Sequence, residues 1–160
     1  KDLFSKNFSN YSQKISHFGF SLLILSILLN SIFSGEIITN LKVGDQVSYK
    51  NLNIKFESVE NKSFQNYTSL RASFKIEDKK NIIFLYPELR IYDQPVTITS
   101  EADIKTTLFS DKFLVMNLVK GADYFNIRYQ NKPFMVWIWI STFILIIGGV
   151  ISLFKRIYEK

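Results

Sequence analysis

One side chain of this 160-residue sequence, that of His17, is suited by its type and position to bind a cofactor. His17 lies one residue inside an apolar run, and an ionisable group within a membrane span is a functional candidate by default. A neutral imidazole is also a common axial ligand of haem iron. The alternative is an interfacial histidine that hydrogen-bonds to lipid headgroups. Only the first interpretation gives His17 a cofactor.

Other candidate groups for catalysis are few. The chain has no cysteine and a single histidine, which excludes disulfides, thiolate nucleophiles and metal sites built from Cys or clustered His. Among neighbouring acidic residues, only Glu101 and Asp103 would share a strand face, and such pairs are typical of solvated turns. The sequence contains no Gly-rich phosphate loop and no nucleophile motif. We therefore expect no catalysis from these residues alone.

Two apolar runs without formal charge must position His17. Residues 16–33 and 134–154 would form helices of roughly 27 and 31 Å, close to the hydrocarbon thickness of a bilayer. The sequence thus predicts two transmembrane helices, with flanks at 1–15 and 155–160. The first run is also compatible with a signal peptide that is cleaved near Ser34.

The positive charge is concentrated at the two ends of the chain. The formal net charge is +6, and residues 1–15, 155–160 and 34–133 each contribute +2. Excess Lys and Arg at both outer flanks predicts both termini on the cytoplasmic or matrix side. Residues 34–133 would then lie in the periplasm or intermembrane space. Because this segment is nearly balanced in charge, nucleic acid is excluded as a partner.

The segment 34–133 alternates apolar and polar residues in the manner of β-strands. Six to eight short strands would form a compact antiparallel barrel or sandwich. Only residues 100–108 indicate a helix. Turns are predicted at Gly44-Asp45, Lys50-Asn51, 78–81 and 120–123, and Pro87 is expected at an edge or bulge. The predicted fold is two transmembrane helices that flank an extracytoplasmic antiparallel β domain.

The first helix would present polar or small residues on two faces, as expected inside a larger bundle. One face carries His17, Ser21, Ile24 and Leu28, and the opposite face carries Gly19, Ser26 and Asn30. The other possible axial ligands are Met116, in the β domain, and Met135, roughly 25 Å from His17 along the membrane normal. A second ligand to any iron at His17 is therefore expected from outside these residues. Because the chain begins with Lys1, we expect it to be a fragment or a split-gene product.

A series of short motifs resembles, in order, the C-terminal part of the CcmF family of cytochrome c biogenesis proteins. The resemblance covers residues 15–156. Its motifs are His17-Phe18-Gly19, Gly44-Asp45, Asn66-Tyr67, Arg71-Ala72 with Phe74, 85–92 with Gln94, 101–104, 113–116, Arg128-Tyr129, Lys132-Pro133-Phe134, 137–139, Gly148-Gly149 and Lys155-Arg156.

This resemblance implies the function of a haem lyase, which joins haem vinyl groups to the two thiols of a CxxCH motif. The family carries a haem b between two transmembrane histidines, and His17 matches the second of these by position. That haem would take electrons from quinol and keep the substrate haem reduced. The Trp-rich loop, the two outer histidines and the first transmembrane ligand of the family are missing here. Catalysis by this segment alone is therefore not expected.

The resemblance also implies partners and a location. The partners are the remainder of the CcmF-type polypeptide or its split subunit, the haem chaperone CcmE, and apocytochrome c with its thiol-handling chaperones. The location is the bacterial or mitochondrial inner membrane. Alternation places Glu88, Arg90, Tyr92 and Gln94 on one face, which we expect to dock the haem chaperone or the apocytochrome. A structural salt bridge at Glu88 or Arg90 is the alternative. The rival function is a non-enzymatic, membrane-tethered adaptor whose β domain binds a partner protein.

Overall fold

The computed structural model describes residues 2–78 and 81–158, which form two compact units. One unit contains two helices together with the short segments 106–111 and 132–134, and the other is a β-sandwich. Of the turn predicted at 78–81, residues 79 and 80 lie outside the described residues. The prediction of an antiparallel β domain flanked in sequence by two apolar helices is confirmed.

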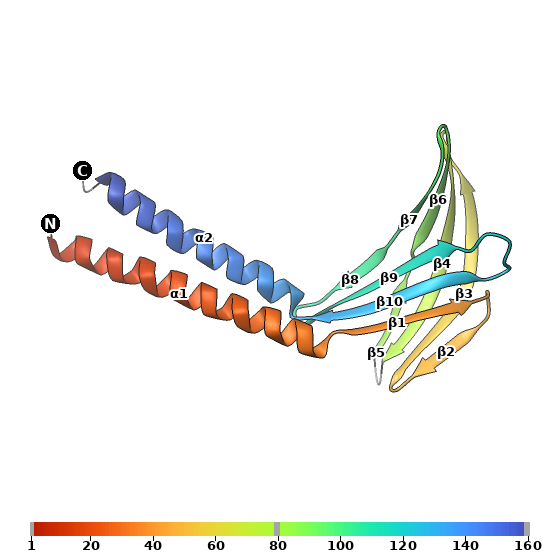
Figure 1. Cartoon of the computed structure of the whole chain (residues 1–160), viewed down its shortest axis with the longest axis horizontal. Helices are drawn as coiled ribbons and strands as arrows, with labels where there is room; N and C mark the ends of the chain where they lie inside the picture. Colours follow the sequence, from red (N-terminus) through yellow and green to blue (C-terminus); the bar gives the residue numbers. More distant parts are fainter. Residues whose placement is uncertain (1, 79–80, 159–160) are drawn as a thin grey trace. The chain divides into compact units, whose positions relative to one another are not determined.

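The two helices are α1 (Asp2–Phe33) and α2 (Met135–Tyr158), which run side by side and antiparallel (Figure 1). The parts long and apolar enough to cross a membrane are Tyr11–Phe33 and Met135–Phe154. The residue before α2, Phe134, has a φ of 59°, and its carbonyl accepts the amide of Trp137 at 3.1 Å. This turn changes the extended chain into the helix.

The helices pack through small residues that repeat every seven positions. Ser12, Gly19 and Ser26 of α1 are buried, as are Ser141 and Gly148 of α2. A seven-residue repeat keeps one seam of each helix facing its neighbour. Small side chains at that seam let two membrane helices approach closely, because lipid offers no hydrophobic force to drive the helices together.

Two glycines of this seam leave no room for a side chain. A Cβ atom on Gly148 would lie 2.9 Å from the backbone nitrogen of Ser16, and one on Gly19 would lie 2.9 Å from Cγ2 of Ile144. The Ser12 hydroxyl donates a hydrogen bond of 2.9 Å to the Gly148 carbonyl, across the seam. Backbone contact and one polar bond therefore hold this end of the pair.

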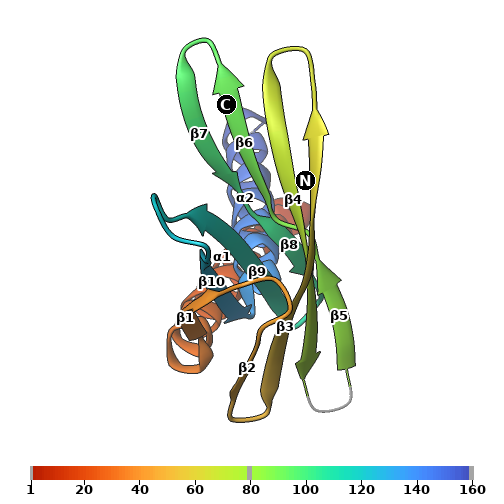
Figure 2. The same ribbon diagram turned by 90° about the vertical axis from the view of Figure 1, so that its right-hand side faces the viewer.

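The β unit consists of two antiparallel sheets, so the sandwich and not the barrel is formed (Figure 2). The four-stranded sheet has the order β1-β10-β9-β8, and the larger sheet has the order β2-β3-β4-β6-β7, with β5 also paired to β4. The strands are β1 Gly35–Leu41, β2 Gln46–Tyr49, β3 Leu52–Ser63, β4 Tyr67–Asp78, β5 Asn81–Leu85, β6 Glu88–Asp93, β7 Val96–Glu101, β8 Asp103–Thr106, β9 Ser110–Leu118 and β10 Phe125–Pro133.

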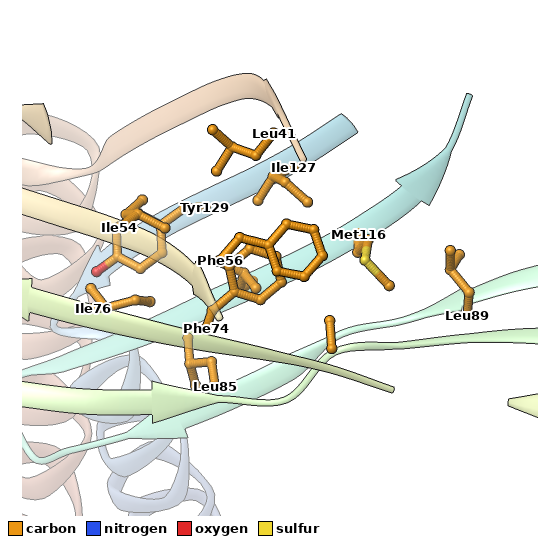
Figure 3. Packing of buried hydrophobic residues seen from close by; sticks show 12 residues of the cluster. Leu41, Ile54, Phe56, Phe74, Ile76, Leu85, Leu89, Met116, Ile127 and Tyr129 are labelled. Atoms are coloured by element: carbon orange, nitrogen blue, oxygen red, sulfur yellow. The ribbon is translucent and has the colours of Figure 1, made fainter. Parts of the chain in front are cut away.

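The core of the sandwich is apolar and aromatic (Figure 3). The rings of Phe56 on β3 and Phe74 on β4 stack with centroids 4.3 Å apart, and both side chains are fully buried. The predicted inward face of β4 is confirmed at Ala72, Phe74 and Ile76, which are all buried. Alternation along each strand therefore decided which side chains enter the core.

The helix expected at residues 100–108 is wrong. This stretch contains the end of β7, the strand β8 and the turn into β9. Ser100 pairs with Leu89 of β6, and Thr99 pairs with Arg90. The β-branched residues that precede this stretch and lie within it favour an extended chain, and ladder pairing of β7 with β6 outweighs the weak local helical pattern.

Candidate functional site

His17 lies on the exposed face of α1 that points away from α2. Ser21, Ile24 and Leu28 share this face and are exposed as well. The opposite face carries Gly19 and Ser26, which are buried against α2. Of the two packing faces that the sequence predicts, one thus has its partner within this chain, and the face of His17 is uncovered.

The second polar position of the covered face is Asn30. Its side-chain amide donates a hydrogen bond of 2.6 Å to the carbonyl of Pro133, the second residue before α2. This bond joins the end of α1 to the start of α2. Together with the contact between Ser12 and Gly148, it fixes the register of the two helices, so the height of His17 along α2 is determined.

The two other possible axial ligands predicted from the sequence, Met135 and Met116, do not share a site with His17. Ser16 contacts Gly148 and Gly19 contacts Ile144, so His17 lies near residue 146 of α2, eleven residues from Met135, which corresponds to roughly 17 Å along the axis. This distance is shorter than the sequence-based 25 Å, yet it still excludes one iron bound by both side chains. Met116 is fully buried in the sandwich core. No group of three or more His, Cys, Asp or Glu suited to a metal ion occurs among the described residues.

The predicted docking residues of β6 share a face, with one exception. Glu88, Arg90 and Tyr92 alternate with Leu89, which is buried in the core. Gln94 follows β6 and lies in the exposed turn to β7, so it does not belong to the face of the strand. The strand ends at Asp93 because the chain reverses at Gln94-Pro95 to pair β7 with β6.

The carboxylate of Glu88 is the centre of an ion-pair network. Arg90 Nη2 lies 3.3 Å from Glu88 Oε2, and Arg71 Nε lies 3.8 Å from Glu88 Oε1. The Ser69 hydroxyl donates to the same carboxylate at 3.4 Å. The side chains of Glu88 and Arg90 are 25% and 35% exposed. The salt bridge expected as the alternative is therefore present, and it leaves part of both groups open to a partner.

Aromatic rings support Arg90 on the same surface. Its guanidinium lies 5.5 Å from the ring centroid of Tyr67. The ring centroids of Tyr67 and Tyr92 are 5.3 Å apart. A hydrogen bond to Tyr92, followed by one to Glu88, raises the pKa of Arg90 above its usual value. The guanidinium is thus fixed in position as well as permanently charged.

Sequence reasoning missed the contribution of β4 to this surface. Arg71 pairs in register with Glu88 on one side and with Glu60 of β3 on the other, and it also lies 5.2 Å from the ring of Tyr86. The alternation of β4 does place Arg71 on the outward face, but only strand pairing identifies its neighbours. Beside it is a depression of about 320 Å³, lined by Ser58, Glu60, Arg71, Ala72, Ser73 and Tyr86.

Comparison with known proteins identifies the family. The sequence model described as the CcmF C-terminal beta-sandwich matches residues 32–133, which are the whole sandwich and its two ends. The chain belongs to this family. The match covers the β-sandwich, and the two flanking helices lie mostly outside it.

Several CcmF proteins resemble the chain over nearly its full length. The cytochrome c-type biogenesis protein CcmF of Pseudomonas aeruginosa is 28% identical over 154 residues, which are 94% of this chain and 23% of that protein. CcmF of Escherichia coli is 28% identical over 156 residues, or 96% of this chain and 24% of that protein. The chain thus spans about a quarter of the length of these curated relatives.

A solved structure named cytochrome c heme lyase CcmF has the same fold. It superposes with a TM-score of 0.66 and 18% identity, over 92% of this chain and 25% of that one. Because it covers 92% of the chain, the matched region includes residues of the two helices as well as the sandwich.

Proposed function

We propose that this chain is the C-terminal module of a cytochrome c haem lyase. The family match over the sandwich and the similarity of the helices to CcmF proteins support this proposal. Because the chain spans about a quarter of its relatives, the remaining helices and the catalytic surface would be supplied by the rest of the polypeptide or by a split subunit. Joining haem to the two thiols of apocytochrome c would be the activity of that assembly.

His17 would bind the iron of a membrane haem b from one side. The observation that carries this role is the exposure of His17 on the α1 face that α2 leaves uncovered. The small side chain of Ser21, one turn further along, leaves space beside the imidazole, and the exposed Lys14, one turn before it, offers a positive charge to a haem propionate. When bound, such a haem would pass electrons from quinol and keep the substrate haem reduced. The opposing ligand would come from another helix.

The test of this role is the reduced absorption spectrum of the full protein purified with its partners. His17→Ala should remove most of the b-type absorbance, and added imidazole should restore part of it, because it can occupy the vacated axial position. Ser21→Ala, on the same face one turn away, should keep the spectrum. Full b-type absorbance in the His17→Ala protein would contradict the assignment and favour the membrane-tethered adaptor.

The two transmembrane helices would place both termini on the cytoplasmic or matrix side of the inner membrane. The excess of Lys and Arg in residues 1–15 and 155–160 supports this orientation. A reporter that is active only in the cytoplasm should therefore be active when fused after Lys160. It should be inactive when inserted at Gly121, in the exposed turn between β9 and β10. The reverse pattern would overturn the proposed topology.

The surface around Glu88 and Arg90, where β4 pairs with β6, would dock the haem chaperone CcmE or the apocytochrome. Its partly exposed Arg71, Glu88 and Arg90 form a fixed pattern of charge, which favours specific recognition of a complementary surface. Arg90→Glu should lower cytochrome c maturation while the protein level is maintained. Lys75→Glu is the matched control, because Lys75 forms another ion pair on β4, with Glu77.

Two results separate docking from a purely structural role. If Arg90→Glu reduces maturation and the protein level together, the ion pair is structural. If Arg90→Glu and Lys75→Glu reduce maturation equally at normal protein level, the effect is one of general surface charge. Only a selective loss in Arg90→Glu supports docking at this surface.

A further inference from the structure

The turn between β8 and β9 carries two large apolar side chains at its tip. Leu108 and Phe109 are 53% and 62% exposed. Tight turns normally use Gly, Pro, Asn, Asp or Ser, whose backbone preferences or side-chain hydrogen bonds suit the reversal. Leu and Phe offer neither advantage, and exposing both to water is unfavourable. The composition of this turn therefore indicates a contact outside the described residues.

The turn is closed by its own hydrogen bonds. The amide of Thr107 donates to the carbonyl of Ser110 at 3.0 Å, and the Thr107 hydroxyl donates to the same carbonyl at 2.7 Å. The amide of Ser110 in turn donates to the Thr107 hydroxyl at 3.1 Å. These bonds satisfy the amides of Thr107 and Ser110 and the carbonyl of Ser110. Backbone polar groups need such partners when a segment moves from water into lipid.

A hydrogen bond fixes the turn at the start of α2. The amide of Phe134, the residue directly before α2, donates to the carbonyl of Phe109 at 2.9 Å. The turn therefore lies at the height at which the transmembrane segment Met135–Phe154 begins. Trp139, which is 63% exposed, lies roughly 6 Å further along the helix. Aromatic side chains at this height are typical of the boundary between headgroups and acyl chains.

The end of α1 adds exposed apolar residues at the same height. The hydrogen bond from Asn30 to Pro133 places the last turn of α1 beside the start of α2. Ile32 and Phe33, in that last turn, are both exposed. The apolar side chains of the β8–β9 turn thus continue the apolar surface of the two helix ends.

We propose that the β8–β9 turn is a third membrane contact of this chain, in which Leu108 and Phe109 insert into the headgroup boundary of the bilayer. The occupant of this apolar surface is lipid, because the turn is tied to the first residue before a transmembrane segment and the backbone groups that close it, those of Thr107 and Ser110 and the carbonyl of Phe109, are hydrogen-bonded. The contact would limit the movement of the β8–β9 hairpin relative to the membrane. This inference depends on the two transmembrane helices and not on haem binding by His17.

Single spin labels on the full polypeptide, reconstituted in nanodiscs of phosphatidylethanolamine and phosphatidylglycerol, test the proposal. The present segment contains no native cysteine, so Phe109→Cys introduces one labelling site within it. Phe143→Cys, exposed on α2, is the lipid reference. Lys120→Cys, exposed in a turn that also contains Asp123, is the water reference.

A label at residue 109 should collide readily with molecular oxygen and rarely with a water-soluble nickel chelate, as the label at residue 143 does. Access to nickel equal to that at residue 120 would show that the turn lies in water and would overturn the proposal. Shielding from both reagents would also overturn it, because the turn would then be covered by protein. As a second measurement, brominated phosphatidylcholine in the nanodisc should quench the fluorescence of Leu108→Trp and leave that of Lys120→Trp unchanged. The fluorescence of the protein that carries only the native tryptophans is subtracted from both signals.

Discussion

The helix pair and the β-sandwich are packed in opposite ways. In the sandwich, the largest buried side chains are apolar, with Phe56 and Phe74 at the centre, and the described charged residues lie outside except Lys112, which is paired with Asp78. In α1 and α2, every described residue that is buried is a serine or a glycine, and the exposed surface carries Ile, Leu and Phe. The same physical rule explains both regions. Each region exposes the side chains that its surroundings solvate, which are polar groups in water and apolar groups in lipid.

This inversion shows which force holds each region together. The sandwich excludes water from apolar surface, and large side chains gain most from this exclusion. The helix pair gains nothing from burying Leu, because lipid is equally apolar, so close backbone approach and hydrogen bonds such as that from Ser12 to Gly148 hold it. The two regions should therefore respond differently to the same class of substitution.

The largest effect is expected from a cavity in the sandwich. Phe74→Ala removes a fully buried ring that stacks on Phe56 and should destabilise the sandwich by about 3–5 kcal/mol. Pulse proteolysis of the reconstituted full chain in denaturant measures this change. The control is Phe84→Ala on β5, where the ring is exposed and its loss should have little effect. Equal effects of the two substitutions would contradict the water-driven core.

A smaller effect is expected from adding bulk to the helix seam. Gly148→Leu forces side-chain atoms into the space occupied by Ser16 and should destabilise the pair by about 1–3 kcal/mol. Gly149→Leu is the matched control, because no atom lies within 4 Å of the position of its Cβ. Spin labels at the exposed Tyr11 and Val150 should report a longer or broader distance in Gly148→Leu only. An unchanged distance would show that the seam tolerates bulk.

Removal of the polar bond across the seam should cost less. Ser12→Ala abolishes the hydrogen bond to the Gly148 carbonyl and should weaken the helix pair by about 0.6 kcal/mol. The same pair of labels should show a small population at longer distance. Ser152→Ala, an exposed serine of α2, is the control and should leave the distance unchanged. A loss as large as that of Gly148→Leu would make the hydrogen bond, and not close packing, the main contact.

The smallest effect concerns pH and appears only in alkaline solution. Burial, reinforced by the negative charge of Asp78, raises the pKa of Tyr129 above its usual value of 10.0. The neutral phenol is therefore favoured in the folded state, and its contribution is complete below about pH 10 and is lost as the pH rises further. The stability of the sandwich should fall above this pH, and Tyr129→Phe should remove part of the fall. Tyr49→Phe, at an exposed ring, should not.

Local patterns made the elements of both regions predictable. Apolar runs of sufficient length identified the two helices, and period-two alternation identified most strands, because both signals depend on neighbours along the chain. The same locality produced the error at residues 100–108, where pairing of β7 with β6 outweighed the local pattern. It also placed Gln94 with β6, although the chain reverses there.

By itself, the sequence determined the order of elements, the apolar character of the two helices and the presence of one histidine within the first of them. Only the tertiary structure decided that His17 lies on the uncovered face of α1, that Arg71 joins Glu88 and Arg90, and that the tip of the β8–β9 turn meets the start of α2. The physical reason is distance along the chain. Periodicity is set by adjacent residues, whereas register and contact depend on segments that meet after folding, such as Phe109 and Phe134.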